Sequence, residues 1–123
     1  MLAAGPLQPI TAAQASGGLS MPPPDAKLFG LNQEDAAWVN RRQTPQPLGV
    51  YQDPLHFDAA RLAALPRSFI DCTAPALPTI DVMRQRVRRE PGWQVFELAT
   101  GHDAMVSAPG PLAALLIDIA RHA

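Results

Sequence analysis

The residue in this sequence best suited to chemistry is a histidine that follows a glycine. His102 comes after Gly101 in the stretch ELATGHDAMVSAPGPLAALLIDIA, where a strand-like run gives way to a helix that Pro111 is predicted to open. Histidine exchanges a proton near neutral pH, which suits it to general acid–base catalysis. His102 is therefore the candidate catalytic residue, and the side chains that would act with it must be found.

The other histidines, the cysteine and the neighbouring aspartate have no supporting pattern. His56 and His122 show no ligand-like spacing with His102, and no carboxylate or thiolate pattern accompanies them, so no metal and no cofactor is expected. Cys72 ends a predicted strand and is interpreted as buried and inert. Asp103 cannot easily fold back to orient the ring of its neighbour, so we interpret it as a loop or capping residue.

A serine nucleophile of the Gly-x-Ser-x-Gly type is missing from the sequence. Two serines lie in the N-terminal stretch, one begins a predicted strand and one follows the histidine loop: Ser16, Ser20, Ser68 and Ser107. None has the glycine-flanked setting in which a serine sits on a sharp strand-to-helix turn. The sequence thus supplies a general base without an obvious nucleophile.

Composition excludes several classes of function. A chain of 123 residues suffices for one domain with a modest core, and a net charge of −1 gives no reason to expect nucleic acid or a membrane surface as a partner. The arginine run RQRVRRE, residues 84–90, is interpreted as a solvated helix face because the rest of the chain is not basic. A single cysteine excludes internal disulfides and favours a reducing cytoplasm. Prolines and the Gly17-Gly18 pair interrupt the uncharged stretch 1–24, so no membrane span is expected.

Strands and helices alternate in the second half of the chain. Asn32 is predicted to cap one helix, Asp58 to begin a short second helix and Thr79 to cap a third, with a loop over 44–54. Strands are predicted over 67–73 and 92–99, and a final helix from Pro111. Two strands joined by a helix are expected to lie parallel, which indicates an α/β fold with an unfinished sheet. The expected organisation is an irregular or flexible segment 1–24, a helical region 25–66 and an α/β unit 67–123.

The stretch GHDAMVSAPGPLAALL resembles the terminal catalytic segment of the α/β-hydrolase fold. The preceding PRSFIDCTAPALPTIDVMRQRVRREPGW looks like the penultimate strand and its helix. Residues 22–51 resemble the cap of esterase-like members, in particular plant-type methyl esterases, hydroxynitrile lyases and their bacterial relatives. The resemblance implies a partial α/β-hydrolase fold: cap helices, then strand-helix-strand-helix with two parallel strands. It also implies that His102 is the general base of a serine, histidine and carboxylate triad.

The same resemblance sets the expected function. The chain corresponds to the C-terminal half of a probable carboxylic-ester hydrolase, which would supply the triad histidine and act on a small ester once a second chain brings the nucleophile. The triad acid is open: Asp71 lies inside a predicted strand and Asp81 inside a helix. In the cap-like region, Trp38, Val50 and Tyr51 would either line a substrate pocket or pack the cap against the body.

The alternative function is a non-catalytic interaction module, or a split-enzyme subunit, that binds a partner through its cap or its sheet edge. The strand over 67–72 has an edge without a neighbour, and such an edge invites pairing with a second chain or with another copy of this one.

Overall fold

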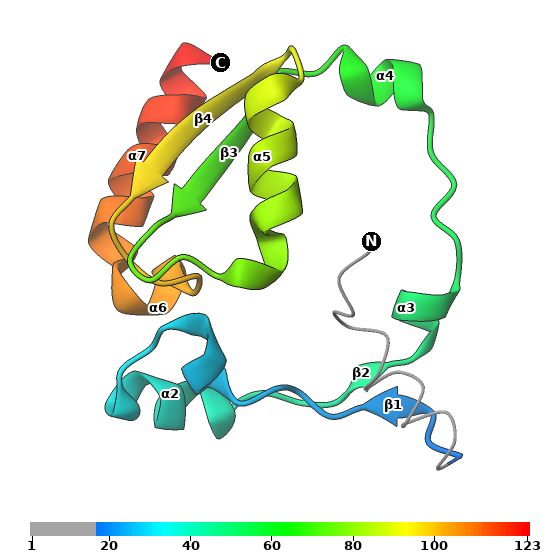
Figure 1. Cartoon of the computed structure of the whole chain (residues 1–123), viewed down its shortest axis with the longest axis vertical. Helices are drawn as coiled ribbons and strands as arrows, with labels where there is room; N and C mark the ends of the chain where they lie inside the picture. The colour runs from blue at the N-terminus through cyan, green and yellow to red at the C-terminus, as the bar shows by residue number, and fades with distance from the viewer. Residues whose placement is uncertain (1–16) are drawn as a thin grey trace.

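The computed structural model describes residues 17–123, and its second half is built on two parallel strands (Figure 1). β3 (Arg67–Cys72) pairs in parallel with β4 (Trp93–Leu98), in a register that sets Arg67 beside Trp93 and Cys72 beside Leu98. Both strands are close to the predicted ranges, and their parallel pairing confirms the predicted α/β class. Within the described residues this sheet has only these two strands.

A helical crossover joins the two strands. The 3-10 turn η2 (Pro78–Ile80) leads into α5 (Asp81–Arg89), and a turn with Gly92 at φ 84° leads into β4. Thr79 was predicted to cap this helix, which is wrong: the residue lies inside η2, and Ile80 occupies the N-cap position without a side-chain hydrogen bond. Pro78 explains the difference, because proline fits the first position of a helical turn, where its missing N–H costs nothing.

Two further helices follow β4. α6 (Ala104–Ser107) is a single turn, and α7 (Pro109–His122) begins two residues before the predicted start at Pro111. In Figure 1, α7 runs along β4 while α5 lies on the other side of the sheet beside β3. Val87 of α5 is almost fully buried, at 1% exposure, so α5 contributes the best-buried large apolar side chain of this half.

The first half forms a small unit of its own. β1 (Ser20–Met21) pairs antiparallel with β2 (Gln46–Pro47), and between them lie η1 (Ala26–Phe29) and α2 (Gln33–Asn40). Asn32 caps α2 as predicted, accepting a hydrogen bond from the Asp35 N–H at 2.8 Å. A core of Ala26, Leu31 and Ala36 packs with Val39 and with Val106 of α6, which ties this unit to the second half.

The segment between the two halves departs from the predicted loop over 44–54. It contains β2 and the one-turn helix α3 (Gly49–Gln52), followed by α4 (Ala59–Ala63). Asp58 lies at the start of α4, as predicted, and its side chain caps the helix. We call residues 49–66 the arm, because they run outward between β2 and β3 (Figure 1). Large apolar side chains of the arm are exposed: Val50, Tyr51, Leu55, Phe57, Leu62 and Leu65.

The predicted N-terminal segment and the membrane prediction can be compared with the structure only in part. Residues 1–16 of the segment 1–24 lie outside the described residues, and the remainder includes β1. None of the helices between Gly17 and Ala123 has the length and apolar character that crossing a bilayer requires.

Candidate functional site

His102 lies just beyond the carboxyl end of β4. Only Ala99, Thr100 and Gly101 separate it from Leu98, the last residue of the strand, and its side chain is half-buried. In parallel sheets the carboxyl ends of the strands are the edge at which ligands and reacting groups gather. The position predicted for His102 at the strand ends therefore agrees with the structure.

Backbone hydrogen bonds fasten the segment before His102 to the end of β3. The Thr73 N–H donates to the Leu98 carbonyl and the Ala74 N–H to the Thr100 carbonyl, each at 3.0 Å. The Thr100 side chain, 9% exposed, is hydrogen-bonded through its hydroxyl to that of Ser107 in α6. These hydrogen bonds fix the segment that leads into His102 both to the end of β3 and to α6.

The turn that follows η1 contacts the histidine directly. The His102 N–H donates to the Phe29 carbonyl at 2.9 Å, and the Phe29 and His102 rings lie with their centroids 5.8 Å apart, tilted by 38°. A Cβ at Gly101 would lie 2.6 Å from the Phe29 carbonyl oxygen, so only glycine permits this approach. The role of Gly101 in the structure is to let the Phe29 backbone come close.

The imidazole has no acidic partner within the described residues. No hydrogen bond or ion pair between residues 17 and 123 engages the His102 ring; the one histidine ion pair found there joins His122 to Asp118. Asp103 occupies the N-cap position of α6 without a side-chain hydrogen bond, while its carbonyl accepts from Val106 and Ser107. The described residues therefore hold a general-base candidate without the carboxylate that a triad needs.

Asp71 is the most strongly paired acid in the structure. Its side chain, on β3, is 2% exposed and accepts hydrogen bonds from Arg84 at 2.6 Å and Arg88 at 2.5 Å, both on α5. Arg88 also lies 3.3 Å from Glu97, which sits beside Asp71 on β4, and Arg84 pairs with Asp81. Both carboxylate oxygens of Asp71 are engaged, so this acid is not available to orient His102.

The pKa of Asp71 reflects two opposing effects. Burial raises the pKa, but the hydrogen bonds and positive charges of Arg84 and Arg88 together outweigh burial and hold the pKa below its ordinary value. Asp71 in turn raises the pKa of the Arg84 guanidinium through its hydrogen bond. The cluster is therefore charged at neutral pH, and it joins β3 to α5.

The interpretation of the arginine run as a solvated helix face was wrong for Arg84. The Arg84 side chain is only 13% exposed and turns inward to Asp71, whereas the Arg88 side chain stays exposed and donates to Asp71 from the surface. The spacing held a signal for this contact, because residues four apart share a helix face, and an aspartate in a largely apolar strand requires a cationic partner when buried. Arg86, by contrast, pairs with Glu90 near the surface.

The remaining candidates are placed away from His102 or otherwise engaged. Cys72 is half-buried, and burial followed by the charge of Asp71 raises the pKa of its thiol, which keeps it protonated and unreactive. His56 lies exposed on the arm, and the Trp38 ring is covered by the Arg42 guanidinium at 4.2 Å. Within residues 17–123, no group of His, Cys, Asp or Glu side chains is arranged to hold a metal ion.

Taken together, the described residues define a class: an α/β chain with two parallel strands and, at the carboxyl ends of these strands, an imidazole without a hydrogen-bond partner. The chain is also similar to an enzyme of known activity, a carbendazim hydrolyzing esterase from Nocardioides sp. (strain SG-4G), with 32% identity over 117 residues. The match covers 87% of this chain and 48% of that esterase, so the chain spans about half the length of the curated relative it matches. No protein-family model and no solved structure matches the chain. The comparison supports an esterase-like hydrolase.

Proposed function

We propose that this chain carries the general-base part of an ester hydrolase of the α/β-hydrolase type, in which His102 serves a serine that lies outside these 123 residues. The position of His102, half-buried beyond the carboxyl end of β4, is the observation that carries the proposal. The similarity to an esterase supports it. The missing Gly-x-Ser-x-Gly stretch and the engaged carboxylate of Asp71 support a nucleophile and an acid that come from elsewhere.

In the proposed mechanism His102 moves one proton in each half-reaction. Its neutral imidazole accepts the proton of the serine hydroxyl as the serine oxygen attacks the ester carbonyl, and then gives that proton to the departing alcohol. In the second half-reaction His102 takes a proton from water, whose oxygen attacks the acyl-enzyme, and returns it to the serine. Because one triad member has little effect alone, the isolated chain is expected to show no substantial turnover.

The substrate class is a small carboxylic ester, and the proposed compartment is a reducing cytoplasm, as the single cysteine favours. The relative is named for hydrolysis of carbendazim. We propose that compound as the first substrate to assay, because the match with this relative covers 87% of the chain.

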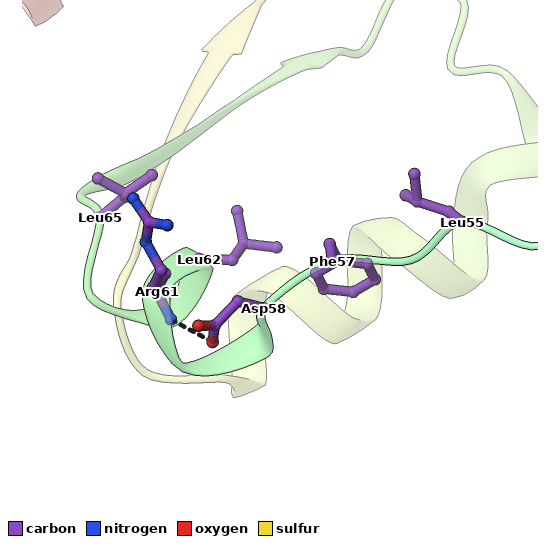
Figure 2. Close-up of a pocket in the computed structure, with 6 residues that line it drawn as sticks. All are labelled: Leu55, Phe57, Asp58, Arg61, Leu62 and Leu65. Carbon is purple, nitrogen blue, oxygen red and sulfur yellow. Dashed lines mark hydrogen bonds between the residues drawn. The ribbon is translucent and has the colours of Figure 1, made fainter.

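Two surfaces of the chain suit contact with the missing part. The edge of β3 that faces away from β4 has no strand beside it within the described residues. The arm leads into this strand and presents exposed apolar side chains; Leu55 and Leu62 project to the same side of it in Figure 2. A second polypeptide, or a longer chain that includes these residues, would cover both.

The same two surfaces favour a second candidate function, that of a non-catalytic interaction module. Leu55 is 82% exposed and Phe57 is 59% exposed. Apolar surface of this kind typically marks a site that a partner covers. Under this alternative the arm binds a protein partner, or the β3 edge pairs two copies of the chain, and His102 has no chemical role.

A chimeric enzyme tests the proposal. The matched segment of the Nocardioides esterase is replaced by this chain, and carbendazim hydrolysis is measured beside the isolated chain. We expect hydrolysis by the chimera, none by the isolated chain, and labelling of the chimera by a serine-reactive fluorophosphonate on the segment from the relative. Circular dichroism checks that the chimera folds; if it does not, the two halves are co-expressed as separate chains.

Two outcomes contradict the proposal. A folded chimera or co-folded pair that neither takes up the fluorophosphonate nor hydrolyses an ester would show that this chain supplies no working base. Binding of the unmatched half with unchanged affinity but no turnover would favour the interaction module.

A further inference from the structure

The turn after η1 fits against the His102 turn through two glycines. Gly30 has a φ of 79°, in the left-handed region, and a Cβ there would lie 2.8 Å from ring carbons of Pro75 and 3.2 Å from the Gly101 Cα. A Cβ at Gly101 would collide with the Phe29 carbonyl oxygen. Segments from three parts of the chain, around Gly30, Pro75 and Gly101, therefore meet where no side chain can be added.

Phe29 lies at the centre of this junction. Its carbonyl accepts the His102 N–H, which fixes the histidine backbone, and its half-buried ring lies beside the imidazole. The neighbouring Leu28 is 66% exposed and takes no part in these contacts. The His102 ring makes no hydrogen bond within residues 17–123. Its one aromatic contact among these residues is the Phe29 ring, and this contact can limit the rotation of the imidazole.

We propose that Phe29 is a positioning residue for His102: its carbonyl holds the histidine backbone and its ring restricts the imidazole to one orientation. The proposal rests on the proposed function for its catalytic consequence, but the geometric part stands by itself. A general base must be within hydrogen-bond reach of the proton it takes, so a ring that samples several rotamers is productive for only part of the time.

Nuclear magnetic resonance of the full chain tests the geometric part. The wild-type chain is expected to show cross-relaxation between Phe29 ring protons and the His102 imidazole protons. Phe29→Leu, which keeps an apolar side chain, is expected to move the imidazole proton shifts toward those of a free histidine, while Phe29→Tyr retains them and Leu28→Ala leaves them unchanged. Absence of the wild-type cross-peaks, or unchanged imidazole shifts in Phe29→Leu, overturns the proposal.

Kinetics of the chimera test the catalytic part. Phe29→Leu in the chimera is expected to lower kcat and kcat/KM together, by about tenfold to about a hundredfold, because a misplaced base weakens only the transition state. Phe29→Tyr should restore most of the rate and Leu28→Ala should not change it. Full activity of Phe29→Leu overturns the positioning role, whereas an inactive parent chimera with the expected cross-peaks counts against the proposed function alone.

Discussion

The His102 turn and the arm both connect larger parts of the chain, but only the His102 turn is held in place by tertiary contacts. The His102 turn is held by backbone hydrogen bonds to Phe29 and to the loop after β3, and close-packed glycines join it to the first half. The arm has good local signals, with Asp58 capping α4, but its apolar side chains face outward. Local sequence determines elements in both regions, whereas only tertiary contacts determine which region is fixed.

This difference has a functional meaning. The well-packed region holds the candidate base, and the poorly packed region presents the apolar surface that a partner or a further segment would cover. The following changes should separate the two regions by their effects on the free energy of unfolding, measured by urea denaturation of the full chain.

Removal of the buried carboxylate should have the largest effect. Asp71→Ala leaves Arg84 and Arg88 without their shared partner, and loss of one member of a buried ion pair costs about 3–5 kcal/mol. The control is Asp81→Ala, at a side chain 57% exposed, which should cost less than about 1 kcal/mol. Equal effects of the two substitutions would mean that the cluster does not stabilise the β3–α5 contact.

Truncation of the buried α5 side chain should come next. Val87→Ala removes two methyl groups from a site of 1% exposure, and we expect a loss of about 2 kcal/mol in the free energy of unfolding. A loss below about 0.5 kcal/mol, typical of surface positions, would contradict the burial of α5 against the sheet.

The Asp71 cluster also predicts how stability depends on acid. The pKa of Asp71 is lower in the folded chain than its ordinary value of 3.8, so the stability it contributes is present above that pH and is lost as the pH falls through the folded pKa. Asp71→Asn should therefore flatten the decline of stability below about pH 4, as followed by urea titrations at several pH values.

Part of the acid dependence should remain in Asp71→Asn. The backbone N–H of Lys27 and the Asn40 side chain lower the pKa of Asp25, and Arg86 lowers that of Glu90. An unchanged slope in Asp71→Asn would assign the whole decline to such surface carboxylates.

A truncation on the arm should have the smallest effect. Leu62→Ala deletes more apolar volume than Val87→Ala but does so at a side chain 46% exposed, so the free energy of unfolding should change by no more than about 0.5 kcal/mol. A loss as large as that of Val87→Ala would show that the arm is packed in solution. In the chimera the same substitution should become costly if the partner half covers the arm.

Much of the second half could be predicted from sequence because its signals are local. The apolar runs of β3 and β4, and the glycine turn before β4, mark the strands, and the short helical crossover requires them to be parallel. The position of His102 then follows from chain order alone. The sequence did not predict that α5 starts at Asp81, because Pro78 and Thr79 are neighbours and both residue types commonly begin a helix.

The contacts around His102 could not be predicted in the same way. Phe29 is 73 positions away in the chain, and neither its carbonyl nor the glycines it meets carry a sequence pattern that names their partner. The contacts that Arg84 and Arg88 make with β3 depend on a single buried aspartate, which composition and net charge do not reveal.

The central claim is that His102 is the general base for a serine that lies outside these 123 residues. Substitution of His102 in the chimera tests this claim most directly. Carbendazim hydrolysis by His102→Ala is predicted to fall about 10⁶-fold in kcat, as expected for loss of a triad histidine, while His56→Ala and His122→Ala retain the parent rate. A folded His102→Ala chimera that hydrolyses the substrate at the parent rate would contradict the account.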